Sequence, residues 1–318
     1  MKPRLNCNTL RSAAFVCGYG ALIGLGFALS RVPLAARNLS AAYPVIVESP
    51  ARPEVERLIR ESGAEDAVAF RTLDVPPQEL MLNEDESFHA ASTMKIPVMI
   101  ELFAQAHEGK LRLDDNLLIT NEFHSIIDGS PYQLDPKDDS DGEVYNAIGA
   151  SWTLRQLCEA MITKSSNLAT NLIIDRLGVA NIQRRVHLLG ADDMHVLRGV
   201  EDEKAFHAGT NNTTTAMALY ILLRAIADKT ACDPHSCKQM LEILERQTFN
   251  EAIPAGLPPG TVIAHKTGEI TGIHHDAAIV FGKRPFILVI MVKGIEDRNK
   301  SSALMAAIAR AIYGGLAR

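Results

Sequence analysis

Apolar residues follow two different spacings along the chain, and these spacings occur in separate blocks. Short apolar runs bounded by turn residues, which are typical of strands, lie near both ends and read AVAFRTL, QELMLNEDE, TVIAHKTG, HHDAAIVFG and PFILVIMVKG. From about residue 111 to 247, apolar residues recur every three or four positions, which predicts amphipathic helices. Two further helices are predicted, PEVERLIRES with Pro53 in its first turn and SSALMAAIARAIYGGLA at the end.

Strands at both ends of one domain bury themselves most compactly in a single sheet. We therefore predict a mixed α/β fold, an α+β sandwich with one antiparallel sheet of about five strands, helices on its faces and an inserted all-helical lobe. The sheet lobe would comprise residues 50–91 and 255–318, and the helical lobe residues 92–254. A site is expected in the cleft between the two lobes. The acidic segment LDPKDDSDGEVY is predicted to be a solvated loop.

The N-terminus has the pattern of a targeting segment. Lys2, Arg4 and Arg11 precede the apolar run SAAFVCGYGALIGLGFALS, and small residues follow in VPLAARNLSAA. This order is typical of a secretory signal, although the apolar run leaves an uncleaved membrane anchor open. Residues 1–36 are thus predicted to be a signal peptide or N-terminal anchor, 37–49 a linker and 50–318 the catalytic domain. We expect export to the periplasm or the exterior, with membrane contact only through an uncleaved leader.

Composition limits the partners. The 318 residues carry a formal net charge of −6, which argues against nucleic acid because phosphate binding needs a basic face. A monomer is expected. Cys232 and Cys237 are close enough to form a disulfide in an oxidising compartment, whereas Cys158 lies in a helical segment without an obvious partner.

No metal or other cofactor is expected. The cysteine spacings do not fit a metal site, and the sequence His274-His275-Asp276 lies in a predicted strand. Adjacent strand residues point to opposite faces, so the two histidines are poorly placed to share one ion.

The stretch FHAASTMKIPVMIELFAQ places Ser92 and Lys95 at the start of an apolar helix. Three residues are about one helical turn, so the two side chains would be neighbours. A serine is a weak nucleophile and needs a nearby base, which a neutral lysine could supply. The plain alternative is that Ser92 caps the helix and Lys95 is solvated.

Two further short motifs occur in settings that could hold a site. Ser165-Ser166-Asn167 precedes an apolar helix, and Lys266-Thr267-Gly268 lies on a predicted strand. Taken alone, Ser165 could be a helix cap and Lys266 a charge that protects a strand edge.

Together and in this order, the three motifs resemble the Ser-x-x-Lys, Ser-Asp-Asn and Lys-Thr-Gly set of the penicillin-recognising serine enzymes. The segments NLATNLIIDRLG with Asn171, PAGLPPGTVIAHKTG and NNTTTAMAL resemble class A serine β-lactamases in particular. The resemblance covers nearly the whole domain and implies a β-lactamase/transpeptidase-like fold. It implies a serine β-lactamase that hydrolyses the β-lactam amide through an acyl-enzyme on Ser92, with a small-molecule β-lactam as substrate.

The resemblance also implies roles for single residues. Lys95 would be the base, Ser165 would pass a proton to the leaving nitrogen, and Asn167 would hold a substrate amide. The Lys-Thr-Gly strand would bind the substrate carboxylate and, through the next backbone N–H, the oxyanion; it contributes Lys266, Thr267, Gly268 and Glu269. The N–H of Ser92 would be the other oxyanion donor.

The loop that should supply the deacylation base departs from the family. The usual wording is Arg-x-Glu-x-x-Leu-Asn, and this chain has LRGVEDEKAFHAGTNN. Arg198 fits the arginine, but Glu201 lies one residue later than the usual glutamate. Glu201 is the first candidate for the base, and Asp202 and Glu203 remain alternatives.

Three smaller departures affect the site. Ser166 stands where the family has aspartate, and His274 stands where many members have a carboxylate-binding arginine. A neutral histidine cannot replace an arginine, so substrate preference is open. Cys158 stands where some members form a disulfide, but the partner position holds Met99, so that bridge is expected to be missing.

Two other functions share the three motifs. A D,D-peptidase or related serine hydrolase would act on cell-wall peptides and needs no loop glutamate of this kind. A β-lactam sensor would acylate and then stall.

Overall fold

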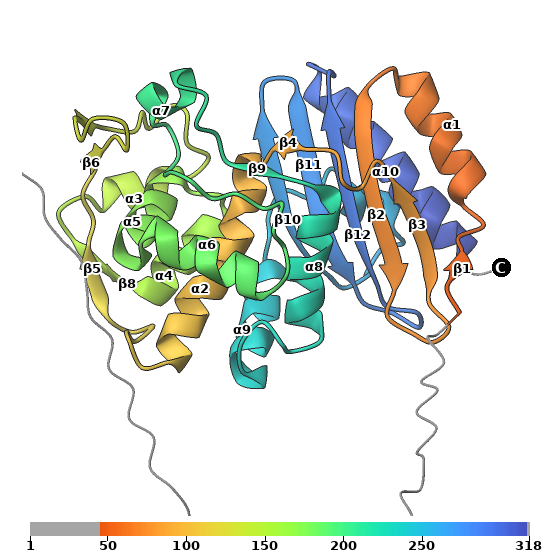
Figure 1. Ribbon diagram of the computed structural model, residues 1–318, viewed down its shortest axis with the longest axis horizontal. Helices are drawn as coiled ribbons and strands as arrows, with labels where there is room; N and C mark the ends of the chain where they lie inside the picture. Colours follow the sequence, from red (N-terminus) through yellow and green to blue (C-terminus); the bar gives the residue numbers. More distant parts are fainter. Residues whose placement is uncertain (1–44, 317–318) are drawn as a thin grey trace, which may run out of the picture. The chain divides into compact units, whose positions relative to one another are not determined.

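The computed structural model describes residues 45–316, and its centre is a six-stranded sheet. The strands lie in the order β1-β3-β2-β12-β11-β10, and every pairing is antiparallel except that of β1 with β3. The bounds are Val47–Glu48 for β1, Glu65–Thr72 for β2, Gln78–Leu82 for β3, Ile263–Ile270 for β10, Ile273–Val280 for β11 and Phe286–Lys293 for β12. Strands from the two ends of the domain meet where β2 pairs with β12 (Figure 1).

The predicted fold class is confirmed: an antiparallel sheet built from both ends of the domain, with helices around it. The sixth strand, β1, is absent from the prediction and lies in the segment expected to be a linker. It has only two residues, which is too short for an alternating pattern to show.

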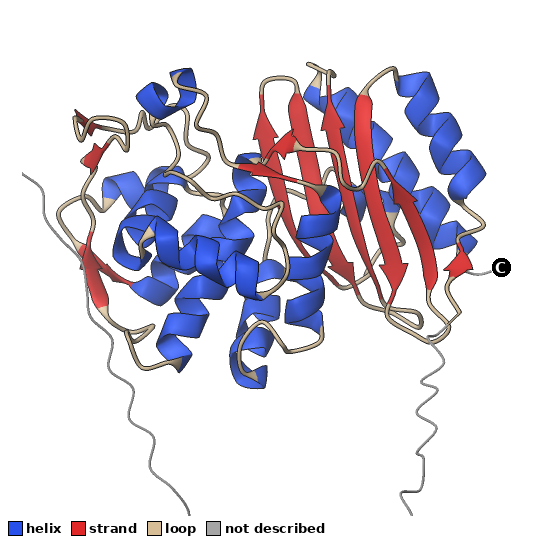
Figure 2. Ribbon diagram, viewed as in Figure 1, coloured by secondary structure: helices blue, strands red, loops and turns tan. Residues whose placement is uncertain are grey.

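Both faces of the sheet are covered, because alternate side chains point to opposite sides. Val68 and Phe70 of β2 belong to one hydrophobic cluster, whereas Ala67 and Ala69 belong to the other. Helices α1 (Arg52–Ser62) and α10 (Arg298–Gly315) pack against the first cluster. Helix α8 (Ala216–Ala227) and the helical lobe pack against the second. Figure 2 shows the helices around the sheet.

The helical lobe surrounds α2, whose side chains are buried from Lys95 to Gln105. The remaining helices are α2 Lys95–His107, α3 Gly142–Asn146, α4 Leu154–Thr163, α5 Asn167–Leu177, α6 Val179–Leu188, α7 Glu203–His207 and α9 Pro234–Leu244, with the 3₁₀ turns η1 Ala91–Met94 and η2 Ile253–Gly256. Three short strand pairs tie the loops: β4 Phe88–His89 with β9 Thr213–Thr214, β5 Asn116–Leu118 with β8 Ser151–Thr153, and β6 Phe123–His124 with β7 Pro131–Tyr132.

The predicted leader, residues 1–36, lies outside the described residues. Within residues 45–316, no helix combines the length and the apolar character needed to cross a bilayer.

Cys232 and Cys237 lie next to each other at the start of α9. Their sulfur atoms are 3.9 Å apart, with the N-cap Asp233 between them in sequence. A disulfide requires about 2.05 Å between the sulfurs, so the two thiols are in contact but not bonded. Cys158 is a fully buried thiol in the same hydrophobic cluster as Met99, far from this pair in sequence.

We predict that oxidised glutathione converts Cys232 and Cys237 to a disulfide, because the two thiols can exchange with it and release two molecules of reduced glutathione. Cleavage after Lys229 and Lys238 yields one peptide with both cysteines, so mass spectrometry should find it lighter by two hydrogens and unreactive with iodoacetamide. After unfolding, iodoacetamide should still alkylate the thiol of Cys158. Full alkylation of residues 230–238 would contradict the prediction, and Cys232→Ser is the control.

Candidate active site

Ser92 lies in the 3₁₀ turn η1, which leads directly into α2. The N-cap residues of η1 and α2 are Ala90 and Met94, and neither makes a side-chain cap bond, so Ser92 is not the helix cap of the plain alternative. Ala91 has a φ of 45°, in the left-handed region that non-glycine residues rarely adopt. Such strain is often found where a structure fixes a functional group.

Lys95 is fully buried, which rules out the solvated alternative. Its Nζ donates to the carbonyl of Ser165 at 2.7 Å, to Ser165 Oγ at 3.2 Å and to Asn167 Oδ1 at 2.9 Å. Burial lowers the pKa of Lys95 to about 7, although the charges of Asp139 and Glu201 act in the opposite direction. Near neutral pH, a substantial fraction of the amine is therefore uncharged.

Ser165 lies between two lysine side chains. Its Oγ is 3.2 Å from Lys95 Nζ and 3.0 Å from Lys266 Nζ. The cap of α5 is the neighbouring Ser166, which accepts from Ala169 N, so the hydroxyl of Ser165 is not used as a cap. Its φ of 58° is again left-handed. A hydroxyl with two amines as neighbours can pass protons between them.

Lys266 lies on β10, the edge strand of the sheet, but it is fully buried, so it is not a protective edge charge. Burial lowers its pKa well below the usual range, and the nearby Lys95 lowers it further. Its Nζ also donates to the carbonyl of Thr267 at 2.8 Å. A side chain at Gly268 would lie 3.0 Å from Ser92 N and 2.9 Å from Thr93 N, so only glycine lets this strand approach the turn that carries Ser92.

Asn167 connects the lysines to the loop acid. Its Oδ1 accepts from Lys95, and its Nδ2 donates to Glu201 Oε1 at 2.9 Å. Burial raises the pKa of Glu201 above its usual value, and the bond from Asn167 opposes that shift. Glu201 has a φ of 60°, so it is another strained residue of the site.

The other two acids of the loop lie elsewhere. Asp202 is buried and caps α7, with its carboxylate bonded to Ser125 Oγ at 2.8 Å and Ile126 N at 3.0 Å. Glu203 is exposed and lies 3.6 Å from His207. Of the three candidates, Glu201 is the one whose carboxylate contacts Asn167.

Two asparagines that the sequence did not mark as structural hold this loop. Asn171 Oδ1 accepts from Val200 N at 2.7 Å, and its Nδ2 donates to Val200 O at 3.0 Å. Asn212 similarly binds both backbone groups of Arg198. Gly199 lies between these anchors, where a Cβ would be 2.6 Å from Asn171 Oδ1. The segment that leads directly into Glu201 is thus held at Arg198 and at Val200.

The acidic segment LDPKDDSDGEVY is more than a solvated loop, which corrects the prediction. Asp139 Oδ2 accepts from the backbone N–H groups of Asn167 at 2.8 Å and Leu168 at 3.0 Å. A carboxylate at a helix N-terminus is favourable because it satisfies free N–H groups and complements the helix dipole. The family motif has an aspartate where this chain has Ser166. In this chain Asp139, from another segment, places a carboxylate at the start of α5.

Two adjoining cavities open at these residues. One has a volume of about 530 Å³ and the other of about 400 Å³, and Ser92, Asn167 and Glu269 line both. The larger also contains Ser165 and Thr267, and the smaller contains Glu201. Ser92 therefore lies where a substrate in one space could be reached by a water molecule in the other.

The two strand histidines contact opposite sides of the sheet. His274 Nδ1 lies 2.8 Å from Ser301 Oγ of α10, and His275 Nε2 lies 2.9 Å from the carbonyl of His89. Within the described part of the chain, no three histidine, cysteine or acidic side chains are grouped as metal ligands.

We predict that Asp139→Ala lowers the free energy of unfolding by about 1–2 kcal/mol, because two N–H groups of α5 lose a charged acceptor. The neighbouring Asp138→Ala is the matched control, since this exposed residue makes no such cap. Urea unfolding of both variants measures the difference. Equal midpoints for the two would show that Asp139 does not stabilise α5.

The described domain matches known proteins over most of its length. A sequence profile of the β-lactamase enzyme family matches residues 50–316. The extended-spectrum β-lactamase PER-1 of Pseudomonas aeruginosa is 24% identical over 301 residues, which cover 90% of this chain and 92% of that protein.

Solved structures agree on the fold. PBP-A superposes with a TM-score of 0.73 at 26% identity, over 86% of this chain and 99% of that one. A variant of the reconstructed last common ancestor of the class A β-lactamases of Gram-negative bacteria also gives a TM-score of 0.73, at 24% identity, over 84% of this chain and 99% of that one. With this β-lactamase/transpeptidase-like fold and a family match that spans the domain, the chain belongs to the β-lactamase enzyme family as a divergent member.

Proposed function

We propose that this protein is a serine β-lactamase that forms an acyl-enzyme on Ser92 and hydrolyses it with water activated by Glu201. The observation that carries the proposal is the chain of contacts from Lys266 through Ser165, Lys95 and Asn167 to Glu201. It joins groups suited to acylation with an acid suited to deacylation. Four stretches of sequence far apart in the chain contribute to it, around residues 95, 165–167, 201 and 266.

In the acylation step, neutral Lys95 takes the proton of Ser92, and Ser92 Oγ attacks the β-lactam carbonyl carbon. The ring C–N bond then breaks, and the nitrogen receives a proton from Ser165 Oγ. Ser165 regains a proton from one of the two lysines that contact it. General acid–base help of this kind contributes roughly 10²–10⁴-fold to the rate.

Backbone and side-chain donors would bind the substrate around this centre. The N–H groups of Ser92 and Glu269 would stabilise the oxyanion, and loss of one such donor typically costs about 10²–10³-fold. Asn167 would bind the acyl amide, and Lys266 and Thr267 the carboxylate.

In the deacylation step, ionised Glu201 would take a proton from water, whose oxygen attacks the ester carbonyl. The bond from that carbon to Ser92 Oγ then breaks, and the proton passes from Glu201 to Ser92 Oγ, which restores both groups. A buried carboxylate with a raised pKa is a stronger base than one in water. This acid separates the proposal from the two alternatives, because a cell-wall peptidase or a stalled sensor has no need for a carboxylate bonded to Asn167.

We also propose that the protein is exported to the periplasm or secreted, with β-lactams or related cell-wall peptides as the small molecules it meets. The support is the order of basic, apolar and small residues in the first 36 positions.

We predict that the wild-type protein turns over a chromogenic β-lactam without a lasting adduct, whereas Glu201→Gln accumulates the acyl-enzyme because deacylation slows by about 10²-fold or more. Intact-mass measurements over time follow the adduct, which Ser92→Ala should not form. Glu203→Gln is the matched control, because it removes an exposed acid two residues away whose carboxylate pairs with His207 and not with Asn167. Unchanged turnover in Glu201→Gln would remove Glu201 from the mechanism, and a lasting adduct in the wild type would favour the sensor or the peptidase. A D-Ala-D-Ala release assay separates those two.

We predict that the single-turnover acylation rate rises with pH around an apparent pKa of about 7, because the uncharged amine of Lys95 is the base. Below that value the rate should fall about tenfold per pH unit as Lys95 becomes protonated. The carboxylate of Asp139 raises the pKa of Lys95, so Asp139→Asn should move the midpoint to lower pH, and Asp138→Asn should not. A rate that is independent of pH between 5 and 9 would exclude Lys95 as the titrating base.

A further inference from the structure

The larger cavity beside Ser92 has an unusual charge balance. Its lining includes the acids Asp138, Glu269 and Glu296 but, among the described residues, Arg298 as the one permanent cation. Lys266 is adjacent, and its Nζ already donates to Ser165 Oγ and the carbonyl of Thr267. Beyond Lys266 and Thr267, Arg298 is therefore the further cation that an anionic substrate in this cavity would meet.

His274, at the position where many family members have an arginine, cannot provide that charge. Its side chain is buried, and Nδ1 is bonded to Ser301 Oγ. Burial also lowers the pKa of His274, so the ring is neutral at pH 7.

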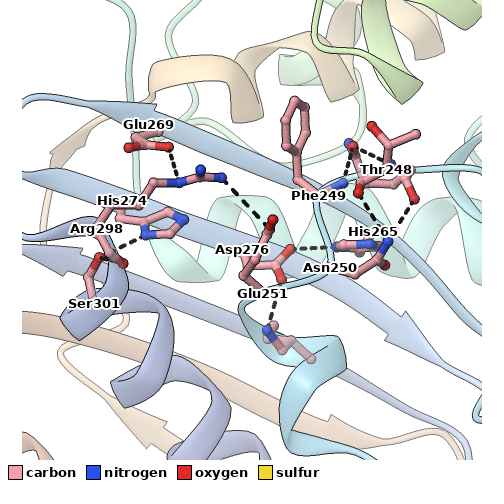
Figure 3. A network of polar contacts seen from close by, with 12 residues as sticks. Thr248, Phe249, Asn250, Glu251, His265, Glu269, His274, Asp276, Arg298 and Ser301 are labelled. Carbon is pink, nitrogen blue, oxygen red and sulfur yellow. Dashed lines mark hydrogen bonds and ion pairs between the residues drawn. The ribbon is translucent and has the colours of Figure 1, made fainter. Parts of the chain in front are cut away.

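Arg298 is the first residue of α10, where the helix dipole disfavours a positive charge. Two acids compensate: Arg298 Nε lies 2.8 Å from Glu269 Oε2, and Nη2 lies 3.7 Å from Glu251 Oε2. The guanidinium also lies 5.9 Å from the ring centre of Phe249, so it is contacted on several sides (Figure 3).

The Glu269 side chain is well placed to compete with a substrate. It follows the Lys-Thr-Gly motif, lines both cavities and is 42% exposed, so it is not locked in the protein interior. Arg298 is similarly 43% exposed. Exposed ion pairs are weak and can be exchanged for another anion.

We propose that Glu269 is a specificity-determining residue, whose carboxylate holds Arg298 as an internal anion in place of the substrate carboxylate. This inference rests on the proposed function, because it concerns the substrate of the same site. A β-lactam carboxylate must displace Glu269 to reach Arg298, so Arg298 adds less to the preference for a β-lactam acid over its uncharged ester than it would without Glu269.

The test compares a penicillin that has a free carboxylate with the methyl ester of the same penicillin. The ratio of kcat/KM for the acid to that for the ester should rise about 5-fold in Glu269→Gln, since Arg298 becomes free for the substrate. It should fall in Arg298→Ala. In the Arg298→Ala background, the further change Glu269→Gln should alter the ratio by less than about 2-fold.

Glu65→Gln is the matched control, because it also removes one acid from an exposed ion pair, with Lys293 at 2.7 Å, and lies in a strand outside both cavities. Its ratio should equal that of the wild type. An unchanged ratio in Glu269→Gln would overturn the proposal. The proposal would also be overturned if Glu269→Gln raised the acid-to-ester ratio by the same 5-fold in the Arg298→Ala background. Direct repulsion between Glu269 and the substrate would then be the cause.

The same comparison should be made for binding by calorimetry in the Ser92→Ala background, where no acylation occurs. If the wild-type protein turns over neither compound, the proposed function fails, and the binding ratio still decides the role of Glu269. If it turns over both but the ratios do not change, only the inference about Glu269 fails.

Discussion

The site depends on two lysine side chains that are buried against one hydroxyl group. Lys95 and Lys266 both donate to Ser165 Oγ, and neither is exposed to solvent. Burial penalises the charged form of each amine and lowers both pKa values, and the charge of Lys95 lowers the pKa of Lys266 further. The structure can therefore keep an uncharged amine close to the nucleophile near neutral pH. The three groups come from α2, the turn before α5 and the edge strand β10, so the pairing of strands from both ends of the domain is a precondition for the chemistry.

Such an arrangement needs a backbone that holds unfavourable conformations. Ala91, Ser165 and Glu201 all have left-handed φ angles without being glycine, and each lies at or beside a functional group. Strained residues of this kind cost of order 1–3 kcal/mol each and persist only where their surroundings fix them. The surroundings here are identifiable: Asn171 holds Val200 through both backbone groups, and Asp139 holds the start of α5. The contacts that stabilise these loops therefore also fix the geometry of the site.

The sequence predicts the helices, the five antiparallel strands and the identity of the motif residues, because periodic apolar patterns and short motifs are local properties. It could not decide among Glu201, Asp202 and Glu203, since all three are acids in one loop and the left-handed φ of Glu201 is not a local sequence property. It also could not reveal Asp139, whose partner groups are the N–H groups of Asn167 and Leu168 on another segment. The acidic loop does contain the signal, several aspartates in succession, but nothing local to that loop says which aspartate caps which helix.

Asp139 compensates for one departure from the family motifs, the serine at position 166. Ser166 removes a carboxylate from the middle motif, yet a carboxylate still meets the N-terminus of α5 from outside the motif. The charges of Asp139 and Glu201 also raise the pKa of Lys95, whereas burial lowers it. A base buried without these acids would be neutral over a wider pH range but would be a weaker proton acceptor. The pKa of Lys95 is thus set by a balance between desolvation and two nearby acids, Asp139 and Glu201, which come from two segments outside the three motifs.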